Sequence, residues 1–194
     1  MYMAELPLEA KKSFLRREIK IFSRVMGIPE PELNFDYPNR SISGFQAGYF
    51  PSSNTVRFEE RILAAMTPAE LRFFLLHEMA HAEQASRGET DFRNEISFRL
   101  GADLHALARS RRCEIRADLR ALELGIAEAD ALSGLEKGRL AEGHFWEENR
   151  SRNSHPSTAM RMQCIRIEAE RLRSGTAKRR QPLPPWRSVS LEAR

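Results

Sequence analysis

The segment from Thr67 to Gly88, TPAELRFFLLHEMAHAEQASRG, constrains the fold more than any other part of this sequence. Thr67 is a favourable N-cap, Pro68 suits the first helical position, and Glu70 completes a capping box. Because Gly88 is a natural stop, we predict one helix of about twenty residues. The segment is mostly apolar, yet two histidines and a glutamate stand in its middle, where a helix that only packs needs none of them.

The two histidines, His77 and His81, are four residues apart, and residues with this spacing lie on the same face of a helix. Two imidazoles on one face can bind a single metal ion, and zinc favours nitrogen ligands. Glu78 would lie beside the metal, where its carboxylate can accept a proton from a water molecule. This is the H-E-x-x-H arrangement of zinc hydrolases. The alternative is a helix whose two histidines only fill space in the core.

A catalytic zinc ion needs a third protein ligand and one open position. His105 and His144 are candidates, but neither lies in a recognisable ligand spacing. Glu114 is a better candidate because it lies on a predicted helix, 33 residues after His81. Asp118 follows Glu114 by one helical turn, so both carboxylates share a face. Two neighbouring acids repel each other unless positive charge lies beside them, and a zinc ion at one and an arginine at the other would supply it.

The remaining pattern predicts an α+β fold, mostly helical, with a small sheet of about three strands. We expect helices at residues 8–26, 90–110, 110–125, 129–143 and 156–175, and strands at 33–37, 42–50 and 54–60. Arg111 and Arg112 would oppose the dipole of a helix that began at Ser110, so a continuous helix through this point is the simpler interpretation. We expect one domain over residues 1–173 and a basic tail, 174–194, without ordered structure.

Composition and charge exclude several classes of protein. The chain has 194 residues, of which 41% are hydrophobic and 30% charged, as in a globular protein. No apolar run approaches the roughly 20 residues that span a bilayer, and the N-terminal segment has no apolar signal core. Two cysteines, Cys113 and Cys164, make no disulfide scaffold, so we expect a soluble cytoplasmic protein. The net charge of +4 is mild and lies partly in the tail, so we expect no nucleic-acid binding.

Three blocks in order carry a resemblance to a known family: HEMAH at 77–81, SRRCEIRADLRAL at 110–122 and SHPSTAMR at 154–161. Together they resemble the zinc metallopeptidases of the HtpX and CAAX-prenyl endopeptidase type, within the gluzincin group. The resemblance covers about residues 30–172 and implies a zincin-like domain. Many members of the family carry transmembrane helices, so this chain resembles a soluble, minimal form.

The resemblance also implies a role for individual residues. One zinc ion per chain would be bound by His77, His81 and Glu114, with Glu78 as the general base. This implied set agrees with the ligands that the helical spacing favours.

Further residues of the resemblance surround the implied ligands. Asp118 would lie behind the ligands and pair with Arg161, and His155 would contact the substrate or the developing oxyanion. The family often has an Asn-Ala-Phe-Ala-like strand along the cleft. The matching stretch here is GFQAG, with Gly44 in the position of the Asn.

We therefore expect a zinc-dependent endopeptidase that acts on a protein or peptide substrate. The strand from Phe45 to Phe50 would pair with an extended substrate by strand addition. One alternative is a catalytically inactive, zinc-stabilised interaction module, which would need neither a general base nor an open coordination position. Another is a different H-E-x-x-H protease, regulatory or linked to DNA, which would need DNA-binding elements beyond the mild basic tail.

Overall fold

The structure, a computed structural model, describes residues 6–35, 47–89, 104–142 and 156–175. Its architecture is α+β, mostly helical with one small mixed sheet, as the sequence predicts. The elements in chain order are α1 (Leu8–Met26), β1 (Glu32–Asn34), β2 (Ala47–Phe50), β3 (Thr55–Phe58), α2 (Glu60–Ala65), α3 (Pro68–Ser86), α5 (Leu104–Glu123), α6 (Glu128–Glu142) and α8 (Thr158–Arg173).

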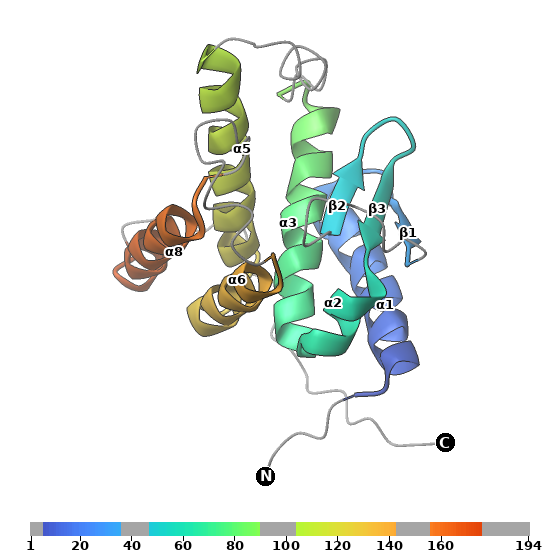
Figure 1. The fold of residues 1–194 in the computed structure, drawn as a ribbon. Coiled ribbons are helices and arrows are strands. Elements are labelled where there is room, and N and C mark those ends of the chain that lie inside the picture. Colours follow the sequence, from blue (N-terminus) through green and yellow to red (C-terminus); the bar gives the residue numbers. More distant parts are fainter. Residues whose placement is uncertain (1–5, 36–46, 90–103, 143–155, 176–194) are drawn as a thin grey trace.

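Helix α3 is the central element of the fold. It lies between the sheet and α5 (Figure 1), and it also packs against α1 and α6. The predicted capping box is present: the Glu70 amide donates to Thr67 Oγ1 at 3.3 Å, and the Thr67 amide donates to the Glu70 carboxylate at 2.8 Å. Every residue from Phe73 to Ala80 is buried, a run that covers all faces of the helix. The surrounding core therefore fixes the place of His77, and His81 follows one turn later on the same helix face.

The three strands form a sheet in the order β1-β3-β2, with β1 parallel and β2 antiparallel to β3. Strand β3 is central, and its Val56 and Phe58 side chains are fully buried. Strand β2 contacts α3, and within the described ranges it pairs with β3 alone. Among the described strands, β2 is therefore the edge strand beside the helix that carries the H-E-x-x-H motif. Much of the strand predicted at 42–50 lies outside the described residues.

The segment after β3 differs from the prediction. The predicted strand at 54–60 ends at Phe58, and the short helix α2, which the sequence did not predict, begins at Glu60. A buried lysine from α1 stabilises its C-terminal end: Lys11 Nζ donates to the carbonyl oxygens of Leu63 at 2.8 Å and Ala64 at 3.0 Å. Because Lys11 lies about fifty positions earlier in the chain, local sequence patterns do not reveal this helix.

Helix α5 passes through Ser110 without interruption, as the positions of the two arginines predict. It is followed by Gly125, whose φ of 98° no other residue type adopts easily. Helix α8 begins after Ser157, whose hydroxyl accepts a hydrogen bond from the Met160 amide at 3.2 Å. The predicted helical residues 90–103 and all but the first two residues of the predicted tail lie outside the described residues. Among the helices that are described, none is long and apolar enough to cross a membrane.

Candidate metal centre

Three of the predicted site residues meet between α3 and α5. The Nε2 atoms of His77 and His81 are 3.2 Å apart. His77 Nε2 lies 3.3 Å from Glu114 Oε2, and His81 Nε2 lies 3.4 Å from Glu114 Oε1. One possible ligand atom from each of the three residues lies within 4.8 Å of the other two. The fold thus brings a carboxylate from the second sequence block to the histidine pair of the first.

These separations fit a tetrahedral zinc site. Ligand atoms about 2.0–2.1 Å from a zinc ion, at the corners of a tetrahedron, lie about 3.3–3.4 Å from one another. The three nearest separations between His77, His81 and Glu114 are 3.2, 3.3 and 3.4 Å. A single separation of this length also fits a long hydrogen bond. Three such separations among two imidazole nitrogens and a carboxylate together match a metal site. Two imidazole nitrogens and one carboxylate leave the fourth corner of the tetrahedron for solvent or substrate.

Asp118 holds the first histidine from behind. His77 Nδ1 donates to Asp118 Oδ1 at 2.9 Å, so Nε2 of His77 faces the candidate site. Arg161 on α8 donates to the same carboxylate twice, from Nε to Oδ2 at 2.7 Å and from Nη2 to Oδ1 at 2.6 Å. The structure therefore contains the predicted contact between Asp118 and Arg161, and with it the packing of α5 against α8.

The electrostatic environment favours positive charge at His77. Burial by itself lowers the pKa of His77, but hydrogen bonds to Asp118 and Glu114 outweigh it and raise the pKa to about 10. Burial raises the pKa of Asp118, yet the charge and hydrogen bonds of Arg161 hold it below the ordinary value. Arg161 is partly buried, with 13% of its side chain exposed. Burial by itself lowers the pKa of Arg161, but the charge of Asp118 outweighs it and raises the pKa above the ordinary value. A bound cation would be stabilised by the same carboxylates that stabilise the proton on His77.

Glu78, the predicted general base, is buried on α3 next to His77. Its charge acts on Arg161, as do the charges of Asp118 and Glu114. The charges of three carboxylates therefore act together on one guanidinium. With both imidazoles neutral the cluster carries two excess negative charges, which a divalent cation neutralises.

Sequence patterns did not single out Gln84, which is a further residue of this site. Its side-chain oxygen lies 3.1 Å from His81 Nδ1, and its side-chain nitrogen donates to the Cys113 carbonyl oxygen at 3.1 Å. The available signal was the position of Gln84 three residues after His81, which places the two on one helix face.

Other predicted candidates are not part of the described site. His155 and His144 lie outside the described residues, as do Gly44 and Phe45. His105 lies on α5, but its side chain is not described. The thiols of Cys113 and Cys164 are free and half-buried, and burial raises the pKa of Cys113.

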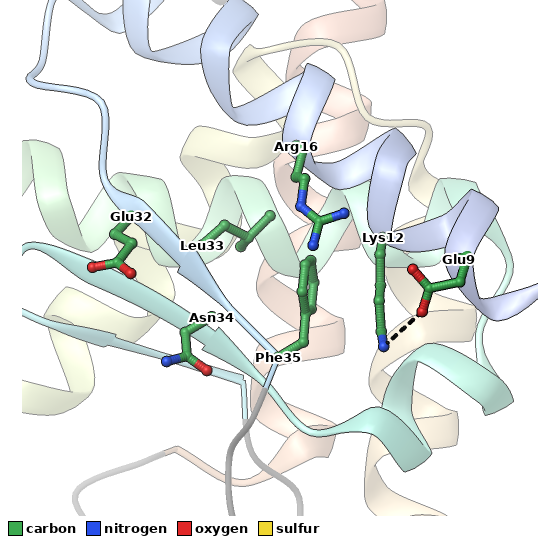
Figure 2. A pocket seen from close by; sticks show the side chains of 7 residues that line it. All are labelled: Glu9, Lys12, Arg16, Glu32, Leu33, Asn34 and Phe35. Carbon is green, nitrogen blue, oxygen red and sulfur yellow. Dashed lines mark ion pairs between the residues drawn. The ribbon is translucent and has the colours of Figure 1, made fainter.

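A pocket of about 210 Å³ lies elsewhere in the molecule, between α1 and β1 (Figure 2). Within it Lys12 Nζ pairs with a Glu9 carboxylate oxygen at 2.9 Å, and the Arg16 guanidinium lies 5.1 Å from the Phe35 ring centre. No residue of the metal centre lines this pocket, so it does not enlarge the candidate site. The lining residues are Glu9, Lys12, Arg16, Glu32, Leu33, Asn34 and Phe35.

No protein-family model, curated protein or solved structure was found to match this chain. Function must therefore be argued from the geometry and chemistry of the site itself.

Proposed function

We propose that this protein is a zinc-dependent endopeptidase with a zincin-like domain, of the HtpX and CAAX-prenyl endopeptidase type that its sequence blocks resemble. The convergence of His77, His81 and Glu114 from two helices, with Asp118 held behind His77, is the observation that carries the proposal. A zinc ion bound by these three residues would supply the Lewis acidity that peptide hydrolysis requires. The remaining chemistry belongs to side chains of the protein.

Glu78 is the proposed general base. Successive residues of a helix point about 100° apart, so Glu78 cannot take the place of His77 as a ligand and lies to its side. From there its carboxylate accepts a proton from the attacking water and returns it to the leaving amine. Arg161, whose pKa is raised in part by the charge of Glu78, keeps positive charge near that carboxylate.

Strand β2 supports a peptide as the substrate. It lies against α3, and an extended chain can add to an edge strand through main-chain hydrogen bonds. Such pairing would run a scissile peptide bond past the helix that carries His77 and His81. We propose an oxyanion or substrate contact for His155 from the resemblance alone.

The two alternatives differ from this proposal in different ways: the interaction module at Glu78, and the protease linked to DNA in its need for a basic binding surface. A zinc-stabilised interaction module needs no base beside its ligands, whereas Glu78 is buried next to His77. On the described surface several arginines form ion pairs with glutamates, so their positive charge is already balanced. This pattern does not support a protease linked to DNA.

The deciding experiment compares wild type with Glu78→Gln in metal content and in digestion of an unfolded protein. We expect both to bind one zinc ion per chain, and Glu78→Gln to lose at least about a hundredfold in cleavage rate. Glu89→Gln is the matched control, because Glu89 lies just beyond α3 and pairs with Arg116. Undiminished cleavage by Glu78→Gln rejects the base. A wild type that binds zinc and cuts nothing favours the interaction module.

A further inference from the structure

The two histidines of the metal centre are held by different chemical groups. His77 donates through Nδ1 to the carboxylate of Asp118 at 2.9 Å. His81 Nδ1 lies 3.1 Å from the side-chain oxygen of Gln84, a neutral amide that is only 6% exposed. The second histidine therefore has an outer partner of its own, which comes from the same helix.

The orientation of the Gln84 amide follows from its second contact. The Cys113 main-chain oxygen can only accept a hydrogen bond, so the group 3.1 Å from it must be the NH₂ of Gln84. The Gln84 oxygen then faces His81. Because an amide oxygen accepts and does not donate, His81 carries its proton on Nδ1 and presents a lone pair at Nε2. That lone pair faces Glu114 and His77.

We propose that Gln84 is a positioning residue of the metal centre, which fixes the tautomer of His81 and ties its ring to the backbone of α5. The inference rests on the proposed zinc site. The contacts run from His81 through Gln84 to the carbonyl of Cys113, the residue just before Glu114. Gln84 therefore couples the second histidine to the carboxylate ligand, although the two lie on different helices.

A neutral partner suits the charge of the cluster. Asp118, Glu114 and Glu78 carry three negative charges that act on the single positive charge of Arg161, so a divalent cation already balances the site. A second carboxylate behind His81 would leave excess negative charge in a buried place. An amide orients the His81 ring without adding charge, so glutamine suits this position. Aspartate suits the position behind His77, because Arg161 balances its charge.

Attachment of the two helices does not require Gln84. The neighbouring Glu83 accepts hydrogen bonds from Arg120 on α5 at 3.0 and 3.3 Å and is itself buried. Glu83 thus connects α3 to α5 while touching neither histidine. A variant at Glu83 separates loss of helix packing from loss of histidine orientation.

The test uses Gln84→Met, which keeps an unbranched side chain of similar length, together with Gln84→Glu and the control Glu83→Gln. The first measurement, ¹⁵N NMR of the neutral His81 ring without zinc, reports the tautomer. The second is the zinc dissociation constant, obtained by competition with a chromophoric chelator. We expect the Nδ1–H tautomer in wild type and its loss in Gln84→Met, with zinc affinity about 10–100-fold weaker.

Gln84→Glu retains an acceptor for His81 but loses the donor to the Cys113 carbonyl oxygen, so it should keep the tautomer and recover only part of the lost affinity. Glu83→Gln should lower stability and change zinc affinity by less than about threefold. An Nε2–H tautomer in wild type, or unchanged affinity in Gln84→Met, overturns the role of Gln84. So does a Gln84→Glu variant that loses the Nδ1–H tautomer although it retains an acceptor for His81. Absence of zinc binding by wild type rejects the proposed function instead, while the tautomer measurement still decides how His81 is held.

Discussion

Arg161 and Asp118 form a two-point ion pair, with nitrogen–oxygen distances of 2.7 and 2.6 Å, between helices α8 and α5. The same carboxylate accepts a hydrogen bond from His77 on α3. Asp118 is fully buried, so a single acid connects three helices inside the protein. The position of a candidate metal ligand thus depends on an arginine 84 residues later in the chain.

Asp118→Asn should be strongly destabilising. The change keeps the shape of the side chain but leaves the partly buried Arg161 without its counter-charge, a loss of about 3–5 kcal/mol. The measurement is the free energy of unfolding in urea. Arg161→Met and the double variant complete a cycle, in which we expect the double change to cost about 1–3 kcal/mol less than the sum. Simple additivity would argue that the two residues do not interact in solution.

Zinc should stabilise the folded protein through Glu114. At a free zinc concentration one hundred times the dissociation constant, the gain in unfolding free energy is about 2.7 kcal/mol, and a chelator should reverse it. Glu114→Gln should remove most of this gain, because it takes one of three ligands away. Glu123→Gln, on the same helix and bonded to Arg120, is the matched control and should keep it. An equal gain in both variants would exclude Glu114 as a ligand.

Glu70 should make the stability depend on pH. Burial raises its pKa, but hydrogen bonds from Lys137, Ser133 and the Thr67 amide outweigh it and hold the pKa below the ordinary value of 4.5. A lowered pKa in the folded state adds stability above about pH 4.5, and that stability is lost as the pH falls through the folded-state value.

Glu70→Gln should therefore be less stable than wild type at pH 7, with the difference shrinking towards pH 3. The measurement is the urea-unfolding free energy of both proteins across this range. A difference that stays constant with pH would mean that the charge of Glu70 contributes nothing.

Gly134 lets α6 approach α3 closely. A Cβ atom at this position would lie 3.2 Å from Phe74 Cε2 and 3.4 Å from Phe73 Cδ1. Gly134→Val should therefore lower the unfolding free energy by about 1–3 kcal/mol, because the added methyl groups overpack this contact. Leu140→Val, at a 65% exposed position of the same helix, should cost about half a kcal/mol or less. Because valine has a higher helix propensity than glycine, an unchanged or raised stability of Gly134→Val would argue against overpacking at this contact.

The sequence predicted best what depends on neighbouring residues. The capping box of α3 and the shared face of His77 and His81 need only helical spacing, and both are present. The segment at 129–143 contains three glycines, which lower its intrinsic helix propensity. At Gly134, however, the lack of a side chain allows α6 to pack closely against α3. This contact can be recognised only in the folded structure.

Contacts across large sequence separations were harder to predict. The resemblance implied that Asp118 pairs with Arg161. The carbonyl oxygen that orients Gln84 belongs to the main chain of another helix, and every residue type has such an oxygen, so no sequence pattern indicates the contact. The order of the strands and the short helix α2 likewise depend on tertiary packing.

Because α3 is buried on all its faces from Phe73 to Ala80, its amide protons should exchange with solvent only when the whole domain opens. Fraying of a terminus would leave His77 in place. Loss of a bound ion through unfolding of the helix around this histidine would then be as rare as global unfolding.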